Sequence, residues 1–396
     1  MAQRELYPQD LPLKILDRAK SPETERYNIV VATDLEGPLL LGDTSLKAMS
    51  TYVRPEHGNP KIDYGSILFG ETYNWFMEKF YNNVSGQLGQ EGSDIVLALP
   101  SLLAIGVTNN NLLELARTSR KTPGSKEYIN FLKSQGALVV GITTAWEKPH
   151  REIVLEELGL DGIIGTDFSL DDAKVKLSES EQMEIEMQMT RDFLSDCFQV
   201  ITDRETCNEN TKKDRLTHNL HQRIQHFFVG ELGITWDQNG RIVSTQDKFI
   251  TELGAIMASY NVIGDKGKAE VAKILFSKYA SAGAPQIAIG DGYNDIRMLN
   301  QSPWSIGING AKATEAAKIG VIANNVQILS ELIKLIQKFP EPTDENVRKV
   351  VTIARLRYGD KAIVHLGGKF GTLSPRLLAM HQIGKREMRR EAALLP

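Results

Sequence analysis

The sequence predicts an α/β protein with a mostly parallel sheet between layers of helices. Three observations support this fold class: short β-branched runs alternate with helical segments, glycines stand where several helices end, and acidic or hydroxyl residues follow the strands directly. Strands of a parallel sheet are buried on both faces and therefore read as short, continuous apolar runs. Their carboxyl ends meet at one edge of the sheet, where ligands bind.

The first strand is predicted at 27–33 and ends at Asp34. A helix over 122–133 then ends before Gly136, a position at which glycine commonly closes a helix. A second buried strand is expected at 137–142. Strand, helix and strand in this order indicate a parallel pair joined by a helical crossover.

The same alternation continues through the rest of the predicted core. A helix is expected at 148–158, closed by Gly159, and another at 267–279. Further strands are predicted at 286–289, 304–308 and 321–323.

Two long segments interrupt this alternation. Residues 46–119 are mostly helical, with a loop at 54–60, and predict a helical cap. Residues 176–254 are polar and helical, and they include a hairpin at 234–243 with an Asp-Gln-Asn-Gly turn, so a second, largely helical insertion is expected. The predicted domains are a catalytic core (22–45, 120–175 and 255–338), the cap, the second insertion and a helical tail (339–396).

Length and charge restrict the class of partner. A chain of 396 residues exceeds one average domain, and its formal net charge of −4 gives no electrostatic case for nucleic acid. No apolar run reaches the roughly 20 residues that a membrane span needs. Cys197 and Cys207 form no zinc or disulfide pattern, and the N-terminus has no apolar signal core, so a cytoplasmic protein is expected.

The residues after the first strand predict phosphoryl chemistry. Asp34 stands at the strand end, where a carboxylate can attack phosphorus and form an acyl phosphate. Glu36 follows two residues later and can protonate the leaving oxygen and then activate water. Taken alone, the segment Asp-Leu-Glu-Gly is more often a plain strand-to-loop exit.

A second acidic segment, Gly290-Asp-Gly-Tyr-Asn-Asp295, follows the strand at 286–289. Magnesium prefers oxygen ligands and uses one or two carboxylates together with phosphate and water. Asp291 and Asp34 are therefore predicted metal ligands, and Asp295 is expected to hold a metal-bound water or a nearby lysine. The two glycines let the backbone turn tightly beside the ion.

Two more segments supply candidates for phosphate binding. Thr143 and Thr144 follow the second strand, and their hydroxyl and N–H groups can bind a phosphoryl oxygen. The segment Gly-Asp-Lys-Gly-Lys at 264–268 contains two lysines that could neutralise the phosphoryl group. We select Lys266 for this role, with Lys268 as the alternative.

These four segments, in this order, resemble the motifs of the haloacid dehalogenase superfamily, especially its phosphoserine-phosphatase-like branch and, more distantly, uncharacterised archaeal members. The resemblance covers about 27–45, 120–175 and 255–325. It matches the nucleophile, the acid/base, the hydroxyl motif, the lysine motif and the Gly-Asp-Gly-x-Asn-Asp motif with Asp34, Glu36, Thr143, Lys266 and 290–295. Glu36 departs from the usual second aspartate, and Pro38 stands where many members carry Thr or Val.

The resemblance implies a Rossmann-like core, a Mg²⁺ cofactor and an aspartyl-phosphate intermediate. It implies metal ligation by Asp34, the backbone carbonyl of Glu36 and Asp291, with Asp295 beside them. Together with the residues themselves, it predicts a phosphatase that hydrolyses a small-molecule phosphomonoester.

Several points stay open at this level. Asn294 and Arg54 are candidates for contacts with the substrate, as are Lys47 and His57 in the predicted cap. A phosphotransferase, or a weakly active or non-catalytic subunit of a larger complex, is an alternative to the phosphatase, because a fold does not fix a function. A homodimer or a protein partner is compatible with the sequence.

Overall fold

The computed structural model describes residues 26–82, 91–238 and 240–394. Residues 22–25 of the predicted core, 83–90 of the predicted cap and 239 of the predicted hairpin turn lie outside the described residues.

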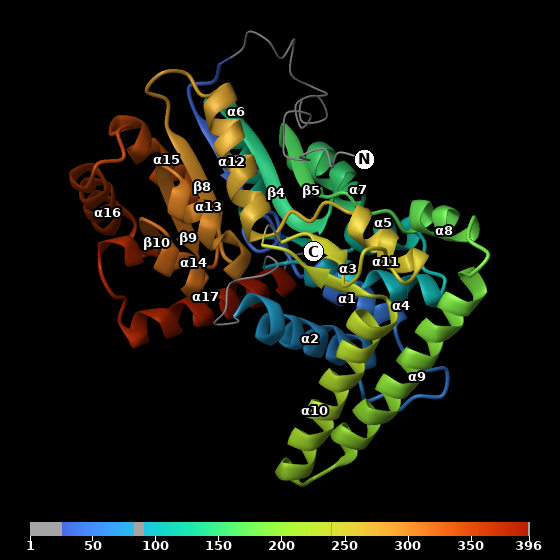
Figure 1. Ribbon diagram of the computed structural model, residues 1–396. Coiled ribbons are helices and arrows are strands. Elements are labelled where there is room, and N and C mark those ends of the chain that lie inside the picture. Colours follow the sequence, from blue (N-terminus) through green and yellow to red (C-terminus); the bar gives the residue numbers. More distant parts are fainter. Residues whose placement is uncertain (1–25, 83–90, 239, 395–396) are drawn as a thin grey trace.

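A seven-stranded sheet forms the centre of the molecule (Figure 1). Its strand order is β11-β10-β9-β8-β1-β4-β5, and each neighbouring pair is parallel except β10 with β11. The strands are β1 (Val30–Thr33), β4 (Leu138–Trp146), β5 (Gly162–Thr166), β8 (Gln286–Gly290), β9 (Trp304–Ile308), β10 (Ile319–Ile322) and β11 (Ile363–Leu366). The predicted α/β fold class is confirmed. Because β1 lies between β4 and β8, the two halves of the sheet meet at β1, which is where such sheets bind ligands.

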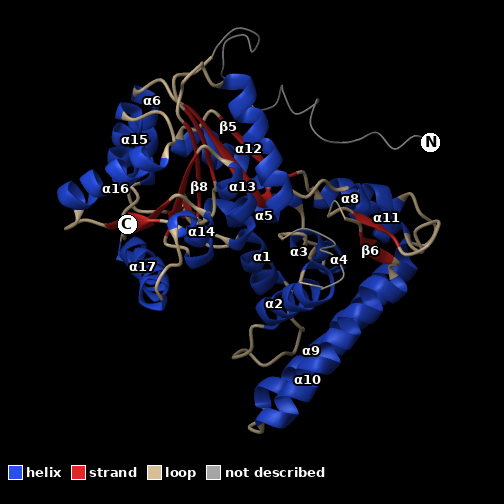
Figure 2. Ribbon diagram, turned by 60° about the vertical axis from the view of Figure 1, so that its left-hand side comes forward, coloured by secondary structure: helices blue, strands red, loops and turns tan. Residues whose placement is uncertain are grey.

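Helices cover both faces of this sheet (Figures 1 and 2). One face packs against α6 (Ser125–Ser134), α15 (Ile328–Lys338) and α16 (Asp344–Tyr358), and the other against α12 (Asp265–Tyr279), α13 (Ile296–Gln301) and α14 (Ala311–Ala316). α7 (Glu147–Glu152) continues as a π-helical segment, η2 (Ile153–Leu158). Gly136 (φ 67°) and Gly159 (φ 80°) adopt left-handed conformations after these helices, as predicted.

The two inserted segments pack around one shared hydrophobic core. Trp75 and Phe76 of the first segment lie 6.0 Å from Phe228 and 5.0 Å from Trp236 of the second, measured between ring centroids. Arg204 of the second segment also binds Glu71 of the first at 2.5 Å. Because they share this core, we describe the two segments together as the cap.

The cap is mostly helical. Its first segment contains α1 (Thr44–Tyr52), α2 (Tyr64–Phe76), η1 (Met77–Tyr81), α3 (Asp94–Leu97), α4 (Leu99–Ala104) and α5 (Asn109–Arg117). Its second contains α9 (Met183–Thr206), α10 (Asn210–Gln225), η3 (His226–Glu231), the antiparallel strands β6 (Ile234–Trp236) and β7 (Ile242–Ser244), and α11 (Glu252–Ser259), with α8 (Leu170–Ser178) leading into it. The predicted hairpin is thus present, and α9 and α10 form an arm that projects away from the sheet (Figure 2).

Two very short strands, β2 (Leu40–Leu41) and β3 (Arg120–Lys121), pair where the first cap segment leaves and re-enters the core. Among the described residues, no single helix has both the length and the apolar composition to cross a membrane.

The C-terminal segment is not wholly helical, which corrects the prediction for 339–396. Its apolar stretch Ile363–Leu366 forms β11, which extends the sheet by pairing with β10, since β10 would otherwise leave its edge open. The last helix, α17 (Pro375–Leu394), then lies along the sheet edge at which β9 and β10 end (Figure 1).

A buried histidine pair fixes α17 to β11. The Nε2 atoms of His365 and His381 are 2.8 Å apart, and Nδ1 of His365 lies 2.7 Å from the carbonyl of Leu366. We place the proton of His365 on Nδ1, which donates to that carbonyl. Its Nε2 then accepts the hydrogen bond that Nε2 of His381 donates. Burial, followed by the neighbouring His365, lowers the pKa of His381 to about 3, and burial also lowers the pKa of His365.

This pair predicts a loss of stability in mild acid. Histidines that are neutral when folded contribute their full stability above the unfolded pKa of about 6.5 and lose it as the pH falls from there toward 3. Between pH 7 and pH 5, urea denaturation should therefore show a loss of about 2 kcal/mol through His381. His381→Leu should flatten this slope, whereas His57→Leu at an exposed position should leave it unchanged. Equal slopes in all three proteins would contradict the assignment.

Candidate active site

Three neighbouring strands bring the predicted site residues together. Asp34 follows β1, Asp291 follows β8, and β4 on the other side of β1 carries Thr143 and Thr144. β4 is longer than predicted, so both threonines lie within the strand, at an irregularity between Ile142 and Trp146 where the register with β5 shifts. Such an irregularity re-aims side chains at the end of a strand.

Asp34, Asp291 and Asp295 form a buried acidic triad. One carboxylate oxygen from each lies within 4.8 Å of the others, and the three residues are 3%, 7% and 0% exposed. Gly37 packs directly on this triad: its φ is 113°, and a Cβ there would lie 2.3 Å from the carboxylate of Asp291. A glycine is therefore required after Glu36, both for the backbone conformation and for the space.

Lys268, and not Lys266, is the lysine of the site. Its Nζ donates to Oδ1 of Asp34 at 2.7 Å and to Oδ1 of Asp295 at 2.8 Å, and the side chain is fully buried. Nζ of Lys266 instead donates to the carbonyl of Gln238 in the cap, at 2.6 Å. The selection of Lys266 is corrected for a simple reason: residues two apart on a helix point to nearly opposite sides, and only Lys268 faces the sheet edge.

Asp295 uses both of its oxygens within the site. Oδ1 accepts from Lys268, and Oδ2 accepts from the backbone N–H groups of Asp291 and Gly292, each at 2.9 Å. Of its predicted roles, holding the lysine is therefore the one that the geometry supports, while Asp34 and Asp291 are better placed as direct ligands.

The triad suits a divalent cation. All its donors are oxygens, the preferred ligands of Mg²⁺, and their negative charge is buried. Burial, followed by the nearby Asp295, raises the pKa of Asp34 even though Lys268 opposes this. Burial also raises the pKa of Asp291, with partial relief from Lys385. The pKa of Lys268 is raised, because Asp295 and Asp34 more than offset the lowering effect of burial.

Glu36 belongs to a hydrogen-bonded network with Thr44 and His150. Oε1 of Glu36 lies 2.8 Å from both the backbone N and Oγ1 of Thr44, and that hydroxyl lies 2.8 Å from Nε2 of His150. Nδ1 of His150 is 2.8 Å from the carbonyl of Trp146. Burial, followed by nearby Asp43, raises the pKa of Glu36 to about 8, and burial lowers the pKa of His150.

This network was not predicted from the sequence. Neutral His150 donates through Nδ1 to the carbonyl of Trp146, so its Nε2 can accept from the hydroxyl of Thr44, which also lies within hydrogen-bonding distance of Oε1 of Glu36. Thr44 begins α1, where a hydroxyl is common, and His150 lies in a helix 106 residues later, so no local pattern links them.

The two predicted threonines have different environments. Oγ1 of Thr143 accepts from the backbone N–H of Ala145 at 3.0 Å, a local turn contact, and the residue is 1% exposed. Oγ1 of Thr144 accepts from the amide of Asn294 at 2.7 Å, which links β4 to the acidic segment after β8. Their N–H and hydroxyl groups lie at the same strand ends as Asp34 and Asp291.

A cavity of about 320 Å³ opens beside the site between core and cap. It is lined by Glu36, Asp43, Ser45, Leu46, Phe69, Gly70, Tyr73, Glu91, Gly92, Asp94, Ile95, Thr144, Ala145 and Asn294. No basic side chain is among these described residues. Of the two residues predicted to contact the substrate, Asn294 lines this cavity, whereas Arg54 is exposed and outside the lining.

The cavity wall is tied to the core by Asp265 at the start of α12. Its Oδ1 accepts from the backbone N–H of Glu91 at 3.0 Å, and its own N–H donates to the carbonyl of Glu91 at 2.9 Å. Burial, then nearby Asp94, raises the pKa of Glu91 to about 8, and burial, then nearby Asp43, raises the pKa of Asp94 to about 7.

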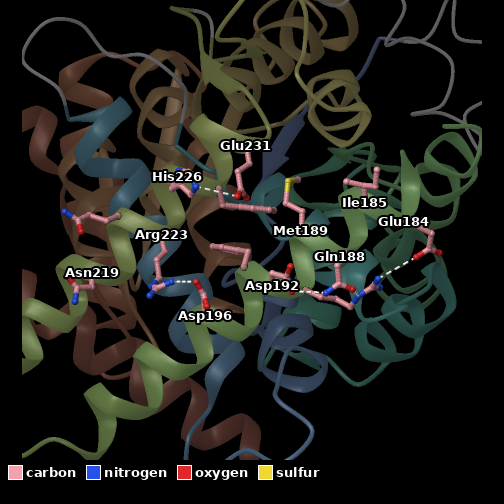
Figure 3. Close-up of a pocket in the computed structure, with 14 residues that line it drawn as sticks. Glu184, Ile185, Gln188, Met189, Asp192, Asp196, Asn219, Arg223, His226 and Glu231 are labelled. Carbon is pink, nitrogen blue, oxygen red and sulfur yellow. Dashed lines mark hydrogen bonds and ion pairs between the residues drawn. The ribbon is translucent and has the colours of Figure 1, made fainter. Parts of the chain in front are cut away.

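A larger cavity of about 970 Å³ lies along the arm of α9 and α10 (Figure 3). Figure 3 shows its charged side chains directed at one another: Arg223 binds Asp196, and His226 lies 3.5 Å from Glu231. None of the predicted site residues lines this cavity, and among the described residues only the triad of the core forms a cluster suited to a metal ion. We therefore take the sheet edge as the candidate active site.

Comparisons with known proteins give a match of fold. No family model and no curated protein matches the chain. The solved structure of gene product AF1437 from Archaeoglobus fulgidus is similar with a TM-score of 0.62 and 15% identity, over 92% of this chain and 96% of that one. At this identity, the likeness shows that the two chains share a fold along nearly their whole length.

More distant likenesses were also found. A phospho-aspartyl intermediate analogue of phosphoserine phosphatase gives a TM-score of 0.41 and 13% identity, over 78% of this chain and 99% of that one. A HAD family hydrolase from Salmonella enterica serovar Typhi gives 0.38 and 12%, over 73% of this chain and 65% of that one. These scores are too low to carry an argument about activity.

Proposed function

We propose that this chain is a Mg²⁺-dependent phosphatase of the haloacid dehalogenase type, acting on a small-molecule phosphomonoester. The observation that carries the proposal is the convergence of Asp34, Lys268, Asp291 and Asp295. They come from three separate parts of the sequence and meet in one buried cluster beside a cavity.

Asp34 is the nucleophile in this proposal. Its Oδ1 is held by the N–H of Leu35 at 2.8 Å and by Lys268, so we assign the attack to Oδ2. A new bond forms between Oδ2 and phosphorus while the ester oxygen leaves and takes a proton from Glu36. Water then attacks the aspartyl phosphate and gives a proton back to Glu36, which releases inorganic phosphate and restores both carboxyl groups.

The remaining groups of the site hold Asp34 in place and offset the negative charge of the phosphoryl group. A divalent cation held by Asp34 and Asp291 would offset the charge on the phosphoryl oxygens. Lys268 forms ion pairs with both Asp34 and Asp295, which offsets their mutual repulsion and fixes their positions. The hydroxyl and N–H groups at Thr143 and Thr144 supply donors for phosphoryl oxygens.

The cavity favours a substrate with no second negative charge. Glu36, Asp43, Glu91 and Asp94 line it, and Lys, Arg and His are absent from its described lining. Burial and neighbouring acids raise the pKa values of Glu36, Glu91 and Asp94. A carboxylate at the far end of a phosphate ester would therefore find no cation here and would disfavour their ionisation further, whereas an ammonium group would stabilise their ionised forms.

Two measurements test the function. Phosphate release from a generic aryl phosphate should require Mg²⁺, stop with EDTA and return when Mg²⁺ is added in excess. Among natural esters, O-phosphoethanolamine and phosphoglycolate form a matched pair, with an ammonium and a carboxylate at similar distances from phosphorus. We expect kcat/KM to favour the ammonium compound by at least about tenfold. The reverse order would contradict the charge argument. No turnover on a broad ester panel, together with stable copurification of another protein, would favour the non-catalytic alternative.

A further inference from the structure

We propose that Lys385 of the C-terminal helix α17 is a phosphoryl-binding residue of this site. Its Nζ donates to Oδ2 of Asp291 at 2.6 Å, although the two residues are 94 positions apart in the sequence. The inference rests on the proposed function and adds a residue that lies outside all four motif segments.

The position of Lys385 follows from the way α17 docks. Gly384, its neighbour, lies so close to the sheet edge that a Cβ there would be 2.6 Å from Cγ2 of Ile322 and 2.7 Å from Oδ1 of Asn309. One turn later Met388 is 2% exposed and contacts the amide of Asn309 at 3.3 Å. The helix therefore packs closely against the sheet edge on both sides of Lys385, at Gly384 and at Met388.

Asn309 itself is held in an unusual conformation at this contact. It is the one described non-glycine residue with positive φ, 52°, and its amide both donates to and accepts from the backbone of Ala323, at 2.6 and 3.0 Å. A left-handed non-glycine residue is disfavoured and persists where surrounding contacts fix it. These contacts join the ends of β9 and β10 to α17, so they fix the position of the helix relative to the sheet.

Lys385 is the accessible cation of the site. Its side chain is 34% exposed, whereas Lys268 is fully buried and donates to two carboxylates. An ammonium group has three donors, and Asp291 is the one hydrogen-bond partner of Lys385 among the described residues. Because the side chain is partly exposed, its remaining donors are open to solvent and to a ligand that enters beside Asp291.

The balance of charge in the site favours a further cation when a phosphoryl group binds. Lys268 and a divalent cation together would balance the three carboxylates of the triad. An incoming phosphoryl dianion would then be uncompensated, and Lys385 supplies a further positive charge. The same ammonium group repels the divalent cation and occupies an oxygen of its ligand Asp291. A phosphoryl-binding Lys385 therefore strengthens phosphate binding while weakening metal binding.

This opposition gives a test with two readouts. Titration calorimetry would measure the Kd of Mg²⁺ alone, and then the Kd of inorganic phosphate at saturating Mg²⁺. Lys385→Met, which keeps most of the length of the side chain and removes its charge, should bind phosphate about tenfold more weakly and Mg²⁺ more tightly. Lys385→Arg should keep most of the phosphate affinity. Arg386→Met, an exposed neighbour on the same helix, should change neither constant.

The outcomes separate this inference from the proposed function. If Lys385→Met bound both Mg²⁺ and phosphate more weakly, Lys385 would merely hold Asp291 in place, and the inference would be wrong. Unchanged phosphate binding in that variant would overturn it as well, while leaving the phosphatase proposal intact. A wild-type protein that binds neither Mg²⁺ nor phosphate would overturn both.

Discussion

Asp34→Asn should abolish phosphate release, lowering kcat by about 10⁴-fold or more. The amide has nearly the shape of the carboxylate, and its oxygen can still accept from the N–H of Leu35. It cannot, however, form an acyl phosphate with phosphorus. The variant also removes one negative charge from the triad, so Mg²⁺ affinity should fall at the same time.

Initial rates with an aryl phosphate at saturating Mg²⁺ measure this loss, and thermal unfolding shows whether the variant is folded. Asp360→Asn makes the same chemical change at an exposed position and should keep wild-type rates. Activity that survives Asp34→Asn would exclude an aspartyl-phosphate mechanism, whatever the metal dependence.

Lys268→Met should produce the second large effect, on both activity and stability. Removing the ammonium group leaves Asp34 and Asp295 buried without their common partner. Breaking a buried pair in this way typically destabilises a protein by about 3–5 kcal/mol. The rate should fall by roughly 10²–10³-fold, as when one preorganised charge-stabilising donor is lost.

Lys266→Met is the matched control, since it is the same substitution two residues earlier on the same helix. Because Nζ of Lys266 bonds to the cap at Gln238, we expect its rate to stay within about threefold of wild type. Urea denaturation with and without Mg²⁺ measures stability in both variants. Lys268→Arg adds a variant that keeps the charge and alters the geometry, so it should fold better than Lys268→Met and still turn over slowly. A larger loss in Lys266→Met than in Lys268→Met would show that the site is wrongly assigned.

Much of the core was predictable because its signals are local. A buried strand that ends at Asp34, a glycine that closes a helix at Gly136, and an acidic turn after β8 each occupy a few consecutive residues. Parallel strands place their carboxyl ends at one edge, so acids that follow β1 and β8 were expected to meet. Their meeting requires only that the two strands be neighbours, as they are.

The errors and omissions share a different cause. Lys266 and Lys268 have the same chemistry and nearly the same sequence position, and only the rotation of α12 against the sheet distinguishes them. Thr44 and His150 support Glu36 through a contact across 106 residues. Shared packing of the two inserted segments also depends on aromatic contacts that neither segment encodes by itself.

The sequence by itself therefore determined the α/β class, the ends of β1 and β9 and the identity of Asp34 and Asp291 as candidates, because hydrophobic periodicity and turn chemistry act over a few residues. The tertiary structure alone decided which lysine lies between the carboxylates, and it brought Lys385 of a tail helix to Asp291. Those contacts join residues 234 and 94 positions apart, so they depend on the order of strands in the sheet and on the seating of α17 at its edge.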